Sequence, residues 1–138
     1  ESVLATAANV PETVVRGTVT ETHGELAAVD TPLGTVQGVH DDRVAGDPVQ
    51  VRIGADAVTL YDDVGTEATS ARNRRQGTVT AIDAGETVLT VTLAVEGVPV
   101  QALVTGESAS LLDLAEGQDV ALTWKATATR VTRETDRT

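Results

Sequence analysis

The sequence repeats itself, and this repetition restricts the folds open to the chain more than any other feature. The run Arg-Gly-Thr-Val-Thr at 16–20 returns as Gln-Gly-Thr-Val-Thr at 76–80. Ala-Gly-Asp-Pro at 45–48 precedes an apolar segment, and Glu-Gly-Gln-Asp at 116–119 precedes a similar one. Two copies of one small unit are therefore expected. Because a short unit buries only a modest core by itself, the copies should pack together.

Each copy has the pattern of short strands. Apolar and polar residues alternate at 15–20, as they do in half-buried strands. Val and Thr abound and aromatic residues make up only 1%, so the core must be aliphatic. Each copy has about five strands, with a short helical turn at 40–43 or a short helix at 107–114, and the segment 127–131 closes the second copy. This order predicts an all-β fold of two tandem five-stranded OB-like barrels.

The repeat also divides the chain into segments. We predict a linker or arm at 1–13, a first barrel at 14–62, a linker at 63–68, a second barrel at 69–133 and a polar tail at 134–138. The start lacks an initiator Met and the pattern of a signal peptide, so we interpret the chain as a fragment or a processed product. No apolar run approaches the roughly 18 residues that suggest a membrane helix.

Charge and composition exclude several classes of function. The net charge of −11 disfavours binding to nucleic acid or anionic lipid. There are no cysteines, which excludes thiolate metal sites, and His23 and His40 lack metal-ligand spacing. No carboxylates pair as a catalyst would need, so we predict neither an enzyme nor a metal site. An acidic chain whose single lysine is Lys125 resembles proteins from a high-salt cytoplasm, which points to a halophile.

One stretch concentrates polar donors at the start of a strand. Ser-Ala-Arg-Asn at 70–73 combines a hydroxyl, a cation and a carboxamide, and an alternating strand follows at 78–82. Converging N–H and O–H donors on a rigid element are what an anion site needs. The next two residues, Arg74 and Arg75, are interpreted as a solvated pair.

Three motifs carry a resemblance to a known family. Ser-Ala-Arg-Asn at 70–73, followed by Gly-Thr-Val at 77–79, resembles the opening signature of molbindin-type domains. Val-Thr-Gly-Glu-Ser at 104–108 and Trp-Lys-Ala-Thr at 124–127 are similar to that family's other two signatures, in the same order. The first half, with Val-Gln-Val-Arg-Ile-Gly-Ala-Asp at 49–56, resembles the companion barrel of this TOBE/Mop type in ATP-binding subunits of molybdate and tungstate importers.

The resemblance implies an oxyanion site for molybdate or tungstate. Its residues are Ser70, Ala71, Arg72, Asn73, Thr105, Ser108, Lys125, Ala126 and Thr127. Molybdate has only acceptor oxygens, which suits hydroxyl donors and cations, together with free N–H groups at a helix start. Two alternatives stay open, since Thr105 and Ser108 also suit a helix cap and Asn73 equally suits a turn brace. The first half lacks these motifs, with Gly54 near the position of Lys125, so it is not expected to build a site of its own, and a contribution of residues or an interface from it stays open.

The resemblance further implies a cytoplasmic regulatory domain of an ABC importer, peripheral to the inner face of the cell membrane. Its partners would be a nucleotide-binding domain and a membrane permease. No Gly-x-x-x-x-Gly-Lys-Ser/Thr loop occurs, so this chain itself has no ATP site. We predict a homodimer with the anion near the interface, because a small barrel has no interior space for it. The alternatives are a free molbindin that stores or buffers molybdate and the non-binding scaffold barrel of a sugar-importer ATPase.

Overall fold

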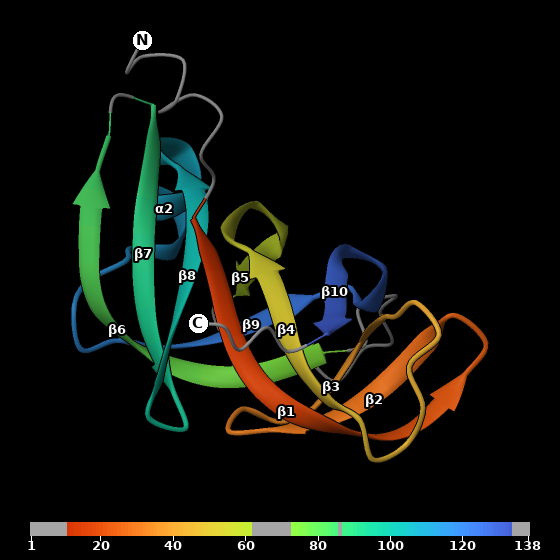
Figure 1. Ribbon diagram of the computed structural model, residues 1–138. Helices are drawn as coiled ribbons and strands as arrows, with labels where there is room; N and C mark the ends of the chain where they lie inside the picture. The colour runs from red at the N-terminus through yellow and green to blue at the C-terminus, as the bar shows by residue number, and fades with distance from the viewer. Residues whose placement is uncertain (1–10, 62–72, 86, 134–138) are drawn as a thin grey trace, which may run out of the picture.

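The computed structural model describes residues 11–61, 73–85 and 87–133, and strands make up most of this part of the chain (Figure 1). In chain order the elements are β1 (Glu12–His23), β2 (Leu26–Thr31), β3 (Gly34–Val39), β4 (Pro48–Gly54), the 3-10 turn η1 (Ala55–Ala57), β5 (Val58–Tyr61), β6 (Asn73–Ala84), β7 (Val88–Val95), β8 (Val98–Thr105), α2 (Gly106–Leu112), β9 (Asp119–Trp124), the 3-10 turn η2 (Ala126–Ala128) and β10 (Thr129–Arg133). None of the described helices is long and apolar enough to cross a membrane.

The strands form two five-stranded sheets, which confirms the predicted architecture. One sheet closes into a barrel with the order β1-β2-β3-β10-β4, and the other has the order β5-β9-β6-β7-β8. Valine, leucine, isoleucine and alanine side chains from both halves join in one hydrophobic core, with Trp124 among its fully buried members. The two copies therefore pack together, as a short repeat requires.

The two halves exchange their last strands. β5 pairs with β9 of the second half, and β10 pairs with β4 of the first half, with Val131 opposite Val51. The prediction that 127–131 closes the second copy is therefore wrong, because the strand at its end completes the first barrel. Each exchange begins at a 3-10 turn, and the first alanine of each turn, Ala55 or Ala126, is buried. These small residues let the chain pass closely from one sheet to the other.

The repeated Gly-Thr-Val run has a packing reason. A Cβ atom on Gly17 would lie 2.5 Å from the carbonyl oxygen of Asp30, and one on Gly77 would lie 2.9 Å from a methyl group of Val95. Each glycine therefore lets its long strand, β1 or β6, cross closely over the next strand. The ladder then shifts register between Val19 and Glu21 in β1, and at the equivalent place in β6. Such irregularities bend a strand, as closing a small barrel requires.

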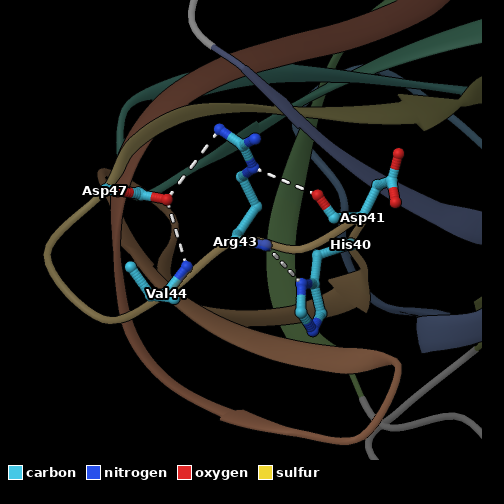
Figure 2. A network of polar contacts seen from close by, with 5 residues as sticks. All are labelled: His40, Asp41, Arg43, Val44 and Asp47. Atoms are coloured by element: carbon cyan, nitrogen blue, oxygen red, sulfur yellow. Dashed lines mark hydrogen bonds and ion pairs between the residues drawn. The ribbon is translucent and has the colours of Figure 1, made fainter.

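Side chains shape the loop between β3 and β4 (Figure 2). Nδ1 of His40 accepts a hydrogen bond from the backbone N–H of Arg43 at 2.9 Å, and the Arg43 guanidinium lies 3.8 Å from the Asp47 carboxylate. Asp42 has a positive φ of 60°, which interrupts right-handed helical geometry. The helical turn predicted at 40–43 is therefore absent there, and the described helical turn of the first half is η1.

Candidate anion site

The first predicted motif lies mostly outside the described residues. Ser70, Ala71 and Arg72 fall in the part of the chain that the structure does not describe. Asn73 opens β6 and is fully buried, with a relative exposure of 0%. Its carboxamide oxygen accepts from the N–H of Gln37 at 2.8 Å, and its amide nitrogen donates to the carbonyl oxygen of Gln37 at 3.0 Å. The Asn73 side chain thus joins β6 to β3 across the two sheets, a contact that differs from the turn brace suggested by the sequence.

The third motif begins directly after β9. Lys125 and Thr127 are exposed, whereas Ala126 between them is buried. The backbone carbonyl of Lys125 accepts from the hydroxyl of Thr129 at 2.8 Å and from the N–H of Ala128 at 3.1 Å, so the turn is fixed by local bonds. This backbone leaves a lysine and a threonine side chain facing solvent from one short, rigid segment. Such a pair supplies a cation and a hydroxyl donor, as an oxyanion requires.

The structure places Asn73, the described residue of the first motif, beside the strand that leads into the third motif. Asn73 is the register partner of Trp124, the residue before Lys125. The beginning of β6 and the end of β9 therefore lie side by side, so Asn73 lies next to the start of the third motif. The turn η2 also packs on β3, the strand that Asn73 binds. Residues from both halves of the chain thus surround the start of β6 and the end of β9.

The second motif lies elsewhere. The hydroxyl oxygen of Thr105 accepts from the backbone N–H of Ser108 at 3.1 Å and donates to the Ser108 hydroxyl at 3.2 Å, so Thr105 caps α2. The helix packs on β7 and β8, whereas η2 packs on β3 and β10. In Figure 1 α2 lies at the left of the molecule and β10 at the right. A single chain therefore does not bring Thr105 and Ser108 to Lys125.

The Arg75 side chain is less exposed to solvent than its sequence context predicts. Its side chain is half-buried; Nε donates to the carbonyl oxygen of Leu33 at 2.7 Å, and another guanidinium nitrogen donates to that of Thr35. The guanidinium also lies over the Trp124 ring, 5.9 Å from its centre. The interpretation of Arg75 as solvated is therefore wrong. A usable signal was present, since Asn73, Arg75 and Gly77 alternate and so share one face of β6.

The environment of Arg75 is electrostatically unusual. Burial lowers the pKa of the Arg75 guanidinium, because desolvation disfavours the charged form, and the carboxylate of Glu96 acts in the opposite direction. An arginine nevertheless stays protonated in proteins. The indole N–H of Trp124 is buried without a hydrogen-bond partner among the described residues. The end of β9, next to Lys125, thus carries a buried indole ring with the Arg75 guanidinium over it.

The first half holds a degenerate copy of this arrangement. η1 and η2 are equivalent 3-10 turns, so Asp56 stands where the second half has Thr127, and Gly54 stands where it has Lys125. In β1 the hydroxyl of Thr13 accepts from the N–H of Gln101 at 3.2 Å, which parallels the contact of Asn73 with β3. The bracing contact is therefore kept in both halves, but the cation is lost and a carboxylate replaces a hydroxyl.

Comparison with known proteins bears on the second half first. Residues 69–131 match the family model of the TOBE domain. A solved structure of the cytoplasmic molybdate-binding protein ModG, in a crystal form grown from PEG with molybdate bound, is also similar to this chain. Sequence identity is 28% and the TM-score is 0.76, over 88% of this chain and 95% of the ModG chain. No curated protein matches the sequence.

The two comparisons agree with each other and with the fold. The TOBE match covers the half that holds Asn73 and Lys125, and the likeness to ModG extends over both halves. Together they support a TOBE/molbindin-type domain in a tandem OB-like arrangement. Neither sheet is complete without a strand from the other half.

Proposed function

We propose that this chain is a non-catalytic, cytoplasmic oxyanion-binding domain whose ligand is molybdate or tungstate. The observation that carries the proposal is the likeness to ModG, whose structure holds molybdate, over 88% of this chain. The position of Asn73 supports it, because Asn73 is paired with Trp124, the residue before Lys125. We assign Ser70, Ala71, Arg72, Asn73, Thr105, Ser108, Lys125, Ala126 and Thr127 to the site.

The chemistry of the residues suits a tetrahedral dianion. Lys125 supplies a positive charge and Thr127 a hydroxyl donor, and both side chains are exposed. Charge-assisted hydrogen bonds contribute roughly 1.5–3 kcal/mol each, so several together reach the roughly 8 kcal/mol of micromolar binding. Asn73 contributes mainly by holding its backbone in place, since its carboxamide already binds Gln37. Hydrogen-bond donors on a backbone that is fixed in place favour an anion of one radius.

Calorimetric titration with four anions tests the proposal. Molybdate and tungstate should bind, sulfate should bind more weakly because it is smaller, and phosphate should bind weakly because its proton needs an acceptor. Equal affinities for sulfate and molybdate would contradict a site of fixed radius. Failure of both molybdate and tungstate to bind at millimolar concentration would contradict the function itself.

The position of α2 supports a site shared between two copies. Thr105 caps α2 and Ser108 lies in it, and this helix packs on β7 and β8, whereas η2, which follows Lys125, packs on β3 and β10. We therefore propose a two-fold homodimer in which one copy supplies these hydroxyl groups and the other supplies Lys125 and Thr127. Two equivalent sites follow from the symmetry. Light scattering with and without molybdate checks this, and a chain that binds molybdate while remaining monomeric at high concentration would contradict it.

We further propose that the domain regulates an ABC importer from the inner face of the cell membrane, in a protein that also carries a nucleotide-binding domain and contacts a permease. A shared anion site would link transport to the oxyanion concentration, because the ligand favours the one arrangement that completes the site. The reading frame upstream of Glu1 tests this role. A Gly-x-x-x-x-Gly-Lys-Ser/Thr loop encoded there would support it, and a start codon directly before Glu1 would contradict it.

A further inference from the structure

Two side chains of β6 bind a part of β3 that no described strand pairs with on one side. β10 runs parallel to β3 but pairs with it only at Val39, so within residues 11–61, 73–85 and 87–133 no strand pairs with the preceding part of β3 on that side. Asn73 binds both backbone groups of Gln37 there, and Arg75 binds the carbonyl oxygens of Thr35 and Leu33. Residue numbers rise along β6 from Asn73 to Arg75 while the numbers of their partners fall from Gln37 to Leu33. The side-chain contacts therefore have the order of an antiparallel strand pair. Arg75 therefore anchors β6 to the first half of the molecule.

The same guanidinium also fixes the other side of the candidate site. It stacks on the ring of Trp124, whose backbone pairs with Asn73 and leads directly into Lys125. Trp124 is only 1% exposed, so the ring has little freedom to move. The Arg75 side chain thus contacts β3 and lies on the same face of β6 as Asn73. It also contacts Trp124, the residue before Lys125.

We propose that Arg75 is a positioning residue of the anion site, which sets the spacing between the segment at Asn73 and the segment at Lys125 and thereby the selectivity among oxyanions. The inference rests on the proposed function. Arg75 does not have to touch the anion, since Nε and two further donors of its guanidinium already bind the carbonyl oxygens of Leu33, Thr35 and Arg74. Its action is geometric, because a planar fork that binds two carbonyl groups and stacks on a ring holds three elements at once.

The arrangement depends on the shape of the guanidinium as well as on its charge. A lysine at this position would keep the charge, but a single ammonium group cannot reproduce the fork and the stacking together. A methionine would keep much of the apolar contact with Trp124 and lose both charge and hydrogen bonds. Arg75→Lys and Arg75→Met therefore separate positioning from simple electrostatic attraction. Arg133→Met is the matched control, since Arg133 is an exposed arginine at the end of β10.

The test is calorimetric titration of the wild type and these variants with molybdate and with sulfate, alongside urea unfolding of each protein. We expect both Arg75 variants to lose about tenfold in molybdate affinity, as bound ions do when an outer positioning group is removed. The ratio of molybdate to sulfate affinity should fall by a similar factor, because loosened donors no longer select one radius. Arg133→Met should leave affinity and ratio unchanged.

The ratio distinguishes positioning from mere loss of folded protein. A smaller folded fraction lowers the apparent affinity for every anion by the same factor, so it leaves the ratio unchanged. An unchanged ratio in the folded variants overturns the inference, and so does a wild-type ratio in Arg75→Lys, which would assign the effect to charge alone. If Arg75→Met fails to fold, Arg75→Lys decides. Absence of molybdate binding by the wild type would overturn the proposed function first, and this inference with it.

Discussion

Replacing Asn73 by alanine should destabilise the protein more than any exposed change on β6. The side chain is fully buried and makes hydrogen bonds of 2.8 and 3.0 Å to the backbone of Gln37. The variant Asn73→Ala leaves an N–H and a carbonyl group of β3 without their partner. An unsatisfied buried group costs about 1–3 kcal/mol. Because Gln37 is only half-buried and water reaches part of it, we expect a total loss of about 2–3 kcal/mol.

Urea unfolding followed by circular dichroism measures this loss. With an m-value of about 2 kcal/mol per M, the midpoint should fall by about 1–1.5 M. Gln76→Ala is the control, because Gln76 is an exposed residue of the same strand and its replacement should change the free energy of unfolding by less than about 0.5 kcal/mol. Equal midpoints for the two variants would refute the argument that Asn73 braces the sheets.

A second substitution at the same position checks the direction of the hydrogen bonds. Asn73→Asp keeps the shape and the acceptor for the Gln37 N–H, but an ionised carboxylate cannot donate to the Gln37 carbonyl group. Burial raises the pKa of such a carboxyl in the folded state, so the destabilisation is present above that pKa and is relieved as the pH falls below it. A destabilisation of Asn73→Asp that does not depend on pH would contradict the assigned donor.

Three further outcomes are expected. Lys125→Ala should weaken molybdate binding about 10- to 100-fold, the value of one charge-assisted contact, while Arg133→Ala should not change it in the same titration; the opposite order would place the site elsewhere. Titration to saturation should give one molybdate per chain, since Asp56 and Gly54 replace Thr127 and Lys125 in the first half, and a count of two would refute that exclusion. The free energy of unfolding should rise between 0.1 and 1 M KCl, because the screening length falls from about 10 to about 3 Å and the net charge is −11; stability that falls with salt would contradict the high-salt interpretation.

The sequence was a good guide wherever a feature depends on neighbouring residues. The alternation of apolar and polar residues located the strands. The recurrence of Gly17 as Gly77 predicted the tandem units, because each glycine is required by a close contact within its own half. The exchange of β5 and β10 was not predictable from pattern, since a strand with the right period fits either sheet. The burial of Arg75 was missed because its partners Leu33 and Thr35 lie in the other half of the chain, although its alternation with Asn73 and Gly77 along β6 was a signal in the sequence.

The candidate site divides in the same way. The resemblance named its residues, and local hydrogen bonds explain the helix cap at Thr105 and the turn after Lys125. The contact of Asn73 with β3 was not predicted, because the residue that it contacts, Gln37, is distant in the sequence. The assignment of the whole set to one anion stays a prediction, since Ser70, Ala71 and Arg72 lie outside the described residues and α2 packs on other strands than η2, the turn after Lys125.

The exchanged strands have a consequence for how the protein folds. The first barrel closes only when β10, near the end of the chain, reaches β4, and β9 gains its outer neighbour only when β5 arrives from the first half. During synthesis neither sheet can be completed until nearly the whole chain has left the ribosome. Pairings between segments so far apart in the sequence make folding slow. Proteolytic loss of either crossing strand would therefore damage both halves together.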